Sequence, residues 1–466
     1  MAQVAIPVAR VLEATGGALV RAGAESFPGV TIDSRAVPAG ALFFAVKGDR
    51  FDGHDFAAAA AKAGARGVVC ARGRGAGLGV DAAVGVAIVE VDDVIAALGA
   101  LGAAHRAAMT DLEVVAITGS NGKTTTKEMT AAILASAAGA DAVLKTEGNL
   151  NNHLGVPLTL LRLHAGHRYA VVEMGMSALG EIAYLTKLAR PDVAVVVSIA
   201  GVHLEQLGTI ENVARAKAEI FGGLGADGVA IYPADEKRMA PHVGALAHAM
   251  TFGPKSPATA SRATVTYDEV TPGPTGLTLR LHLSGVTSAT GVLSHVPLIG
   301  RHNASNAAAA ACVALALDVG EGSILDGLAT VRPAKHRLQL VQLADRTILD
   351  DCYNAAPASM RAALDALVEI TPRGAQKIAV LGDMLELGPE SATLHAEVGA
   401  YAAARVDQLV AVGPQSRHMG STFHTDDVEA ATARVRAVSR AGDVILVKAS
   451  RGMRLERVID ALSEKG

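Results

Sequence analysis

"VVAITGSNGKTTTKEM" occupies residues 114–129 and joins a strand-like apolar run to a helical run through a glycine turn. In such a turn the backbone N–H groups and the helix N-terminus bind phosphates, Lys123 supplies positive charge, and Thr124 can bind Mg²⁺. The spacing is unusual, because Gly119 precedes Lys123 by only four positions and Ile117 stands where the first glycine would be. We expect a phosphate-binding loop here, and the alternative is a chance glycine turn before a helix.

Apolar runs typical of strands alternate with alanine-rich helical stretches along almost the whole chain. The clearest are VVAIT (114–118), YAVVEM (169–174), VAVVVSI (193–199), KIAVLGD (377–383), QLVAVG (408–413) and DVILVKAS (443–450). This alternation predicts an α/β protein with mostly parallel sheets and helices on both faces. Residues 262–298 alternate polar and apolar positions and predict a small antiparallel addition. Changes of pattern near residues 109–112 and 331–336 mark the expected domain boundaries.

Composition excludes several classes of protein. No run of about 20 apolar residues is free of charges and helix breakers, and the N-terminus lacks the pattern of a signal peptide. The three cysteines are scattered and form neither a disulfide framework nor a zinc pattern. A net charge of −4 and 3% aromatic residues argue against general nucleic-acid binding. These features predict a cytoplasmic protein with no membrane span.

Two candidate metal ligands follow predicted strands. Glu173 ends the run at 169–174, and His203 follows the run at 193–199. Ligands of open α/β sheets bind at the carboxyl ends of the strands, so both side chains should face the phosphates. A carboxylate is a natural Mg²⁺ ligand, whereas a histidine suggests a second, less strictly hydrated metal site. The alternative is a structural role for either residue.

Further segments carry polar side chains where site loops are expected. TEGNLNNHLGVPLTLL (146–161) is interpreted as a substrate loop, and a plain Asn-rich turn is the alternative. GRHNASNAAAAA (300–311) opens a helix with two asparagines that could bind a base edge, although Asn303 could equally cap that helix. Two loops after strands, LDDCYNAAPASM (349–360) and LGDMLELG (381–388), carry Asp350, Asp351, Tyr353, Asn354, Asp383 and Glu386.

ENVARAKAEIF (211–221) predicts a helix that Thr209 caps and Gly222-Gly223 end. Lys217 lies on the same stripe as its apolar residues, although a buried ammonium is costly unless it is paired. One interpretation is that the lysine stem covers the edge of the core while the ammonium reaches water. The other is a functional lysine near the phosphates.

Together these segments resemble the Mur ligases, ATP-dependent amide-forming enzymes of peptidoglycan synthesis. The resemblance runs from about residue 31 to residue 452 and includes TIDSRAVPAGALFFAVKGDRFDGHDF (31–56), AKAEIF and KASRG. The segment 31–56, and DDCYNAAPASM with LGDMLELG and His395, are most similar to the ligase that acts last in the pathway. The family fold implies a UDP-sugar-binding domain at 1–110, a central P-loop-type ATPase at 111–331 and a Rossmann-like ligase domain at 332–466.

The resemblance also implies residue roles. ATP would contact Gly119, Asn121, Gly122, Lys123, Thr124, Thr125, Asn303 at the adenine, Arg337 at the γ-phosphate and Asp351 at the ribose. Two Mg²⁺ ions would be held by Thr124, Glu173, His203 and Lys217, the last carrying a carbamate formed with CO₂. The catalytic groups would be Lys123, Lys217, His203 and Arg337. The substrates would contact Ser34, Arg35, Lys47, Asp52, His54, Asn149, Asn152, Tyr353, Asn354 and Asp383.

The implied reaction joins UDP-N-acetylmuramoyl-tripeptide to D-alanyl-D-alanine. The tripeptide carboxylate attacks the γ-phosphate of ATP, and the dipeptide amine then displaces phosphate from the acyl phosphate. Domain closure should exclude water, with a hinge at His336-Arg337, where the family usually has a glycine before the arginine. A second departure is Tyr232-Pro233-Ala234-Asp235 in place of the usual Asn-x-Asp. We expect a monomer.

Three alternatives remain. The preceding Mur ligase, which adds the third amino acid, typically carries Asp-Asn-Pro-Arg, and that tetrapeptide does not occur here. Folylpolyglutamate synthetase usually has Gly-Lys-Gly-Ser where this chain has Gly-Lys-Thr-Thr. A non-catalytic nucleotide-binding scaffold of cell-wall synthesis is the third, and retention of Lys123, Glu173, His203 and Lys217 speaks against it. The sequence is compatible with diaminopimelate or lysine as the third residue of the tripeptide.

Overall fold

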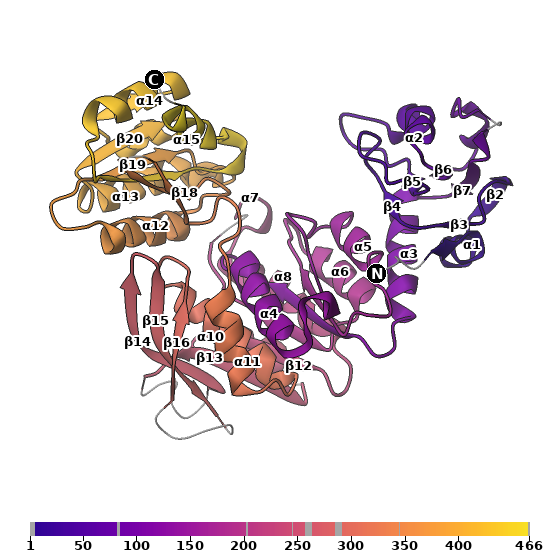
Figure 1. Cartoon of the computed structure of the whole chain (residues 1–466), viewed down its shortest axis with the longest axis horizontal. Helices are drawn as coiled ribbons and strands as arrows, with labels where there is room; N and C mark the ends of the chain where they lie inside the picture. The colour runs from indigo at the N-terminus through magenta and orange to yellow at the C-terminus, as the bar shows by residue number, and fades with distance from the viewer. Residues whose placement is uncertain are drawn as a thin grey trace.

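Three lobes follow one another along the chain in the computed structural model, and the two outer lobes stand on either side of the central one (Figure 1). The structure describes residues 5–81, 84–201, 204–244, 246–256, 263–284, 291–343 and 345–464. Among these residues, no helix has both the length and the apolar character needed to cross a membrane.

The N-terminal lobe holds a five-stranded sheet of order β2-β7-β6-β5-β4, in which only β2 runs antiparallel to its neighbour. Its strands are β2 (Ala18–Arg21), β4 (Val30–Thr31), β5 (Leu42–Phe44), β6 (Gly67–Ala71) and β7 (Ala87–Val91). A short pair, β1 (Ile6–Pro7) and β3 (Ser26–Phe27), lies beside it. The helices are α1 (Val8–Thr15), α2 (Ala57–Lys62) and α3 (Val94–Ala107).

The central lobe is built on a nine-stranded sheet of order β16-β15-β14-β13-β12-β11-β8-β10-β9. Seven parallel strands are β8 (Glu113–Thr118), β9 (Val143–Lys145), β10 (Tyr169–Glu173), β11 (Val193–Val196), β12 (Val229–Pro233), β13 (His248–Pro254) and β14 (Val265–Gly273). The predicted antiparallel addition is confirmed, because β15 (Gly276–Leu283) and β16 (Val292–Val296) continue the sheet from β14 in antiparallel pairing.

Helices cover both faces of this sheet, as the sequence predicts. Val115 and Ile117 of β8 pack on one face in the same apolar cluster as residues of α4, α10 and α11, while Val114 and Ala116 pack with α5, α6 and α8 on the other. This follows from the alternation of side chains along a strand. The helices are α4 (Lys123–Ala138), α5 (Gly155–Leu160), α6 (Glu181–Ala189), α7 (Leu204–Leu207), α8 (Ile210–Ala218), α9 (Ala240–Val243), α10 (Asn303–Ala316) and α11 (Glu321–Thr330).

The C-terminal lobe has a six-stranded sheet of order β17-β18-β22-β19-β20-β21, parallel except at β17. Its strands are β17 (Gln339–Gln342), β18 (Thr347–Asp351), β19 (Lys377–Gly382), β20 (Gln408–Val412), β21 (Phe423–Thr425) and β22 (Val444–Lys448). Its helices are α12 (Pro357–Ile370), α13 (Ser391–Ala403), α14 (Val428–Val438) and α15 (Glu456–Ser463). The predicted α/β class with mostly parallel sheets is confirmed.

Candidate functional site

The glycine turn leads from β8 into α4. Gly122 precedes the helix with φ +83°, a left-handed conformation that glycine adopts without strain, and a Cβ there would lie 2.4 Å from Asn306 Oδ1. Lys123 Nζ donates a hydrogen bond to the carbonyl of Gly119 at 2.7 Å. Burial and the nearby Arg337 lower the pKa of Lys123, while Glu173 opposes that shift. The turn therefore presents a helix N-terminus and a half-buried lysine to the same space.

That space is a cavity of about 1170 Å³ between the central and C-terminal lobes. The central lobe contributes the turn, the ends of β10 and α8, and the start of α10; the C-terminal lobe contributes the loops after β18 and β22. Of the predicted site residues, those that line it are Asn121, Gly122, Lys123, Thr124, Thr125, Asn149, Asn152, Glu173, Lys217, Asn303, Asn306, Arg337, Asp351, Tyr353, Asn354 and Glu386. His203 lies outside the described residues.

Glu173 ends β10 with its carboxylate only half satisfied. Its Oε1 accepts a hydrogen bond from Asn151 Nδ2 at 2.9 Å, whereas Oε2 is buried without a described partner. Such a buried, unpaired carboxylate oxygen is costly unless a cation or donor completes it. Within the described ranges, no group of three or more His, Cys, Asp or Glu side chains is arranged so that it could hold a metal ion. A hard cation here would draw on Glu173 together with the hydroxyl of Thr124, a donor set that suits Mg²⁺.

Lys217 lies on α8, which begins after Thr209 as predicted, with Thr209 Oγ1 accepting a hydrogen bond from the Asn212 N–H at 3.2 Å. Its side chain is only 2% exposed and lines the cavity. It makes no hydrogen bond or ion pair with any residue that the structure describes. Burial, and then repulsion by Lys123, hold the pKa of Lys217 well below its ordinary value. The lysine therefore lies inside the lobe, with its side chain lining the cavity rather than the outer surface.

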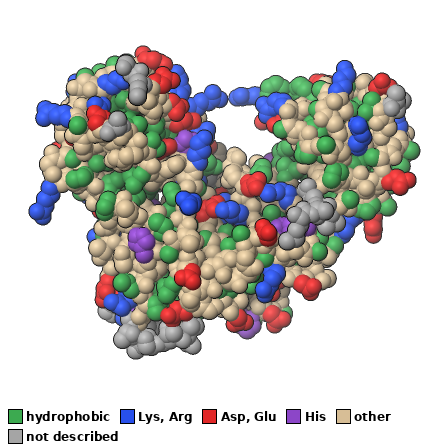
Figure 2. Space-filling model, viewed as in Figure 1, with side chains coloured by type: hydrophobic (Ala, Val, Ile, Leu, Met, Phe, Trp, Pro, Cys, Tyr) green, Lys and Arg blue, Asp and Glu red, His purple; other side chains and the backbone are tan. Residues whose placement is uncertain are grey.

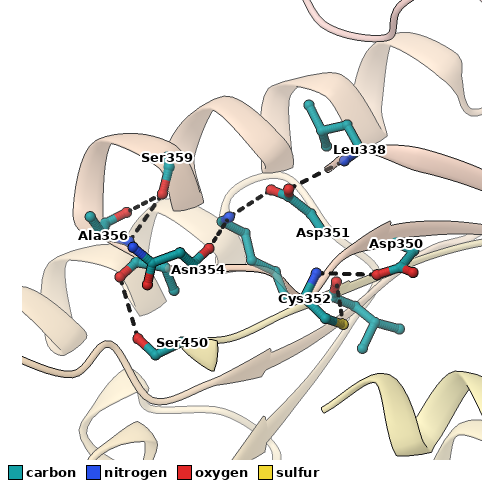
Figure 3. A network of polar contacts seen from close by, with 11 residues as sticks. Leu338, Asp350, Asp351, Cys352, Asn354, Ala356, Ser359 and Ser450 are labelled. Carbon is teal, nitrogen blue, oxygen red and sulfur yellow. Dashed lines mark hydrogen bonds and ion pairs between the residues drawn. The ribbon is translucent and has the colours of Figure 1, made fainter. Parts of the chain in front are cut away.

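The C-terminal face of the cavity holds a polar network (Figure 3). Lys448 Nζ donates to Asp351 Oδ2 at 2.6 Å and to the carbonyl of Asn354 at 2.8 Å. The second carboxylate oxygen of Asp351 accepts the N–H of Leu338 at 3.2 Å. Burial raises the pKa of Asp351, and Lys448 and Arg337 counter that shift. Lys448 and Asp351 therefore satisfy one another within the protein.

The linker between these lobes is conformationally unusual. His336 and Leu338 have φ of +60° and +46°, in the left-handed region that favours glycine. His336 Nδ1 lies 2.7 Å from Asp350 Oδ2, so an ion pair or hydrogen bond holds the ring in place. Arg337, between them, lies over the ring of Tyr353 with its guanidinium carbon 4.1 Å from the ring centroid. The backbone conformation explains why a glycine would suit position 336.

The two asparagines of α10 are already engaged. Asn303 is the first residue of the helix rather than its cap, and its Nδ2 donates back to the carbonyl of Ile299 at 2.8 Å. Asn306 Nδ2 donates to Asn303 Oδ1 at 2.9 Å. The capping interpretation of Asn303 is therefore wrong. A contact between Asn303 and adenine would use its second amide hydrogen or the second lone pair of its Oδ1.

The predicted N-terminal substrate residues do not line this cavity. Arg35 forms a bidentate pair with Asp33, at 2.9 and 2.7 Å. Asp52 Oδ1 accepts from the N–H of His54 at 3.0 Å and lies 2.5 Å from its Nδ1, and His54 Nε2 accepts from the Ala71 N–H at 2.9 Å. Ser34 and Lys47 belong to the same lobe, which Figure 2 shows separated from the C-terminal lobe by an open gap.

Asp383 also lies outside the cavity lining. It follows β19 but is 2% exposed, and its Oδ1 accepts the N–H groups of Gln415 at 3.0 Å and Ser416 at 2.7 Å. The structure thus gives Asp383 a loop-holding role inside the C-terminal lobe.

Several cavity residues were not among the predicted site residues, and three of them bear on its charged groups. Asn151 holds Glu173, Lys448 holds Asp351, and His302, at the start of α10, has its pKa lowered to about 4 by burial and by Lys448. The Asn-rich segment and KASRG were the signals for the first two. Nothing in the sequence indicates which side chain each would contact.

The comparisons with known proteins agree over nearly the whole chain. Residues 26–106, 117–314 and 336–451 match three family domains described as "Mur ligase family, catalytic domain", "Mur ligase middle domain" and "Mur ligase, glutamate ligase domain". The UDP-N-acetylmuramoyl-tripeptide–D-alanyl-D-alanine ligases of Escherichia coli K12 and Bacillus subtilis 168 are 40% and 35% identical, covering 94% of this chain and 94% and 93% of theirs.

Solved structures give the same picture. A crystal structure of MurF from Acinetobacter baumannii is 34% identical with a TM-score of 0.88, covering both chains fully. MurF ligase from Thermotoga maritima in complex with ADP is 28% identical with a TM-score of 0.80, covering 93% of this chain and 97% of that one. A UDP-N-acetylmuramoyl-L-alanyl-D-glutamate–2,6-diaminopimelate ligase is 19% identical with a TM-score of 0.52 over 95% and 96% of the two chains, and shares the fold alone.

Proposed function

This chain belongs to the Mur ligase family, and we propose that it joins D-alanyl-D-alanine to UDP-N-acetylmuramoyl-tripeptide at the expense of ATP. The products are ADP, phosphate and the UDP-linked pentapeptide of peptidoglycan precursor synthesis. One observation carries the proposal: the phosphate-binding turn, Glu173, Lys217 and Arg337 come from distant parts of the chain and line one cavity between two lobes.

Forming an amide in water is uphill, so the carboxylate must first be activated. A carboxylate oxygen of the tripeptide attacks the γ-phosphorus of ATP, the bond to ADP breaks, and an acyl phosphate forms. The amine of the dipeptide then attacks the acyl carbon, phosphate leaves, and the amine loses a proton. Both substrates of the first step are anions, and Lys123 and Arg337 offset their repulsion. Their role is to position and neutralise charge rather than to form covalent bonds.

Mg²⁺ fits the residues present, since Glu173 Oε2 is buried without a described partner beside the Thr124 turn. Thr124, Glu173, His203 and Lys217 would hold two ions. Bound Mg²⁺ would neutralise the phosphates during transfer. The chain's own contribution is to hold the Glu173 carboxylate in the cavity and to keep Lys123 hydrogen bonded at the turn.

We include a carbamate on Lys217 in this proposal. Its buried amine has no described partner, and its lowered pKa favours the neutral form that can react with CO₂. The nitrogen adds to the carbon of CO₂, a proton leaves to solvent, and a carboxylate of charge −1 results. That product would suit a magnesium site, whereas an ammonium facing Mg²⁺ would be repelled.

The UDP-sugar is assigned to the N-terminal lobe, at Ser34, Arg35, Lys47, Asp52 and His54, with Asn149 and Asn152 toward the peptide. Tyr353, Asn354 and Asp383 are kept as substrate residues of the C-terminal lobe, Asp383 acting through the loop that it holds. Asn303 and Asp351 are assigned to the adenine and the ribose. The proposal also includes domain limits at 1–110, 111–331 and 332–466, which the three family matches support. It further includes a monomeric state and a cytoplasmic location.

The test is phosphate release from ATP by the purified chain. We expect release only when both the UDP-tripeptide and D-alanyl-D-alanine are present, with the UDP-linked pentapeptide as product by mass spectrometry. Tripeptides ending in diaminopimelate and in lysine are both supplied. Turnover with the UDP-dipeptide and a free diamino acid would favour the preceding ligase, and ATP binding without turnover would favour a scaffold.

A further inference from the structure

We propose that Asn151 is a positioning residue that fixes the carboxylate of Glu173 so that only Oε2 is free for a divalent cation. The proposal rests on the proposed function, because it concerns the cation of the ATP site. It adds a residue that belongs to neither the metal-ligand set nor the substrate set.

The first observation is the hydrogen bond itself. Asn151 Nδ2 donates to Glu173 Oε1 at 2.9 Å, and Oε2 is the atom left buried without a described partner. A carboxylate tied at one oxygen cannot rotate freely, so its other oxygen points in one direction. An amide also donates without carrying charge, so Glu173 keeps the negative charge that attracts a cation. A lysine or arginine in this place would cancel that charge.

The second observation is that the backbone fixes Asn151 in this position. The N–H of Gly175 donates to the Asn151 carbonyl at 2.8 Å, which ties the Asn-rich loop to the chain two residues beyond Glu173. A Cβ on Gly175 would lie 3.1 Å from Asn151 Cγ and Oδ1, so the absence of a side chain there makes room for the amide. The N–H of Glu173 donates to Thr146 Oγ1 at 2.9 Å, which holds the same strand end from the other side.

The alternative is that Asn151 only holds its loop in place. Two variants separate these roles. Asn151→Leu keeps the size of the side chain and removes the donor, and Asn151→Ala removes both. Gln342→Ala is the matched control. It deletes an exposed side-chain amide of β17, away from the cavity, whose Nε2 donates a hydrogen bond to Thr347 Oγ1 at 3.1 Å.

Two readouts are measured for each variant: the Mg²⁺ concentration that gives half-maximal ligation, and the Mg²⁺ dependence of binding of a non-hydrolysable ATP analogue by calorimetry. We expect both Asn151 variants to need ~10–100-fold more Mg²⁺, the size typical of losing a residue that orients a metal ligand. Binding of the analogue without Mg²⁺, and kcat at saturating Mg²⁺, should stay close to wild type. Gln342→Ala should match wild type throughout.

Two results would overturn the inference. One is a Mg²⁺ requirement of Asn151→Leu within twofold of wild type. The other is a loss of activity in both variants that excess Mg²⁺ does not restore, which is the behaviour of a collapsed loop. If the wild-type chain itself binds the analogue equally well with and without Mg²⁺, the proposed cation site fails instead, and that outcome is recognised before any variant is compared.

Discussion

Each face of the cavity contains a buried lysine, and the two lysines differ in whether the protein supplies a hydrogen-bond partner. On the C-terminal face, Lys448 is 2% exposed and donates to Asp351 and to the carbonyl of Asn354. On the central face, Lys217 is equally buried but has no partner among the described residues. Glu173, also on the central face, keeps one oxygen unpaired.

This difference separates scaffold from binding site. Buried polar groups are normally satisfied, so a pair such as Lys448 and Asp351 is complete as it stands. A face with an unpaired lysine and an unpaired carboxylate oxygen is complete only with ligands. We therefore expect substitutions on the central face to act on catalysis, and substitutions of the Lys448 network to act first on stability.

The largest effect should come from Lys123→Ala. Removing the charge at the phosphate-binding turn should lower kcat by about 10²–10³-fold, the size typical of losing one group that stabilises transition-state charge. Steady-state phosphate release measures it, and Lys377→Ala, which removes a lysine paired with Asp407 elsewhere on the C-terminal lobe, is the control. A fall of less than tenfold would mean that the turn does not hold the reacting phosphates.

Lys217→Ala should also abolish most activity, but in a way that small molecules repair. Bicarbonate or a short-chain carboxylate should enter the space left by the side chain and restore part of the rate. The same additives should do nothing for Lys123→Ala. Full activity of Lys217→Ala without any additive would remove the carbamate from the account.

The stability comparison uses the same substitution at both lysines. Lys448→Met leaves Asp351 buried without its cation, so the free energy of unfolding should fall by about 3–5 kcal/mol. Lys217→Met removes an amine that has no described partner, and stability should stay level or rise. Denaturant unfolding of both variants measures this, and equal losses at the two positions would break the distinction between the faces.

The free energy of unfolding of wild type and of Lys217→Met should depend differently on pH. The pKa of Lys217 is lowered in the folded chain, so between that value and the ordinary one the unfolded chain binds more protons. Its contribution therefore makes the free energy of unfolding rise with pH across that interval. In CO₂-free buffer the advantage of Lys217→Met over wild type should shrink as the pH approaches the ordinary lysine value. A constant difference would contradict the shift.

The smallest effect concerns the contact between the lobes. Arg301, in the turn before α10, pairs with Glu369 of α12 at 2.6 Å, and the arginine is largely exposed. Glu369→Gln should change the free energy of unfolding by no more than about 1 kcal/mol.

X-ray scattering should still show the chain becoming more compact with ATP analogue and both substrates. Absence of compaction in the wild type would count against domain closure.

Much of the fold follows from sequence periodicity, because alternating strands and helices leave few ways to build a parallel sheet. The cavity residues Lys123 and Glu173 were also predictable, since strand ends of one sheet meet at one edge. Lys217 was singled out differently, as a lysine on the apolar stripe of α8. The directions in which side chains point at that edge were not predictable from the sequence. Asp383 follows a strand as Glu173 does, yet it turns inward to bind the N–H groups of Gln415 and Ser416.

Tertiary contacts explain the other differences. The left-handed conformation of His336 depends on the path of the linker and on the contact with Asp350, neither of which is local in sequence. The pairing of Asn151 with Glu173 joins residues on separate segments, and the pairing of Lys448 with Asp351 joins two neighbouring strands. Such contacts are visible only when the sheet edges are assembled.

The central claim is that ligation proceeds through an acyl phosphate. The most direct test traces an oxygen atom of the tripeptide carboxylate into the released phosphate. The tripeptide carboxylate is labelled with ¹⁸O, and the phosphate released during ligation is analysed by mass spectrometry. The account predicts one ¹⁸O atom in each phosphate, because the attacking carboxylate oxygen remains on phosphorus when the amine displaces it. Phosphate without label, released while ATP is consumed, would contradict an acyl phosphate and with it the proposed function.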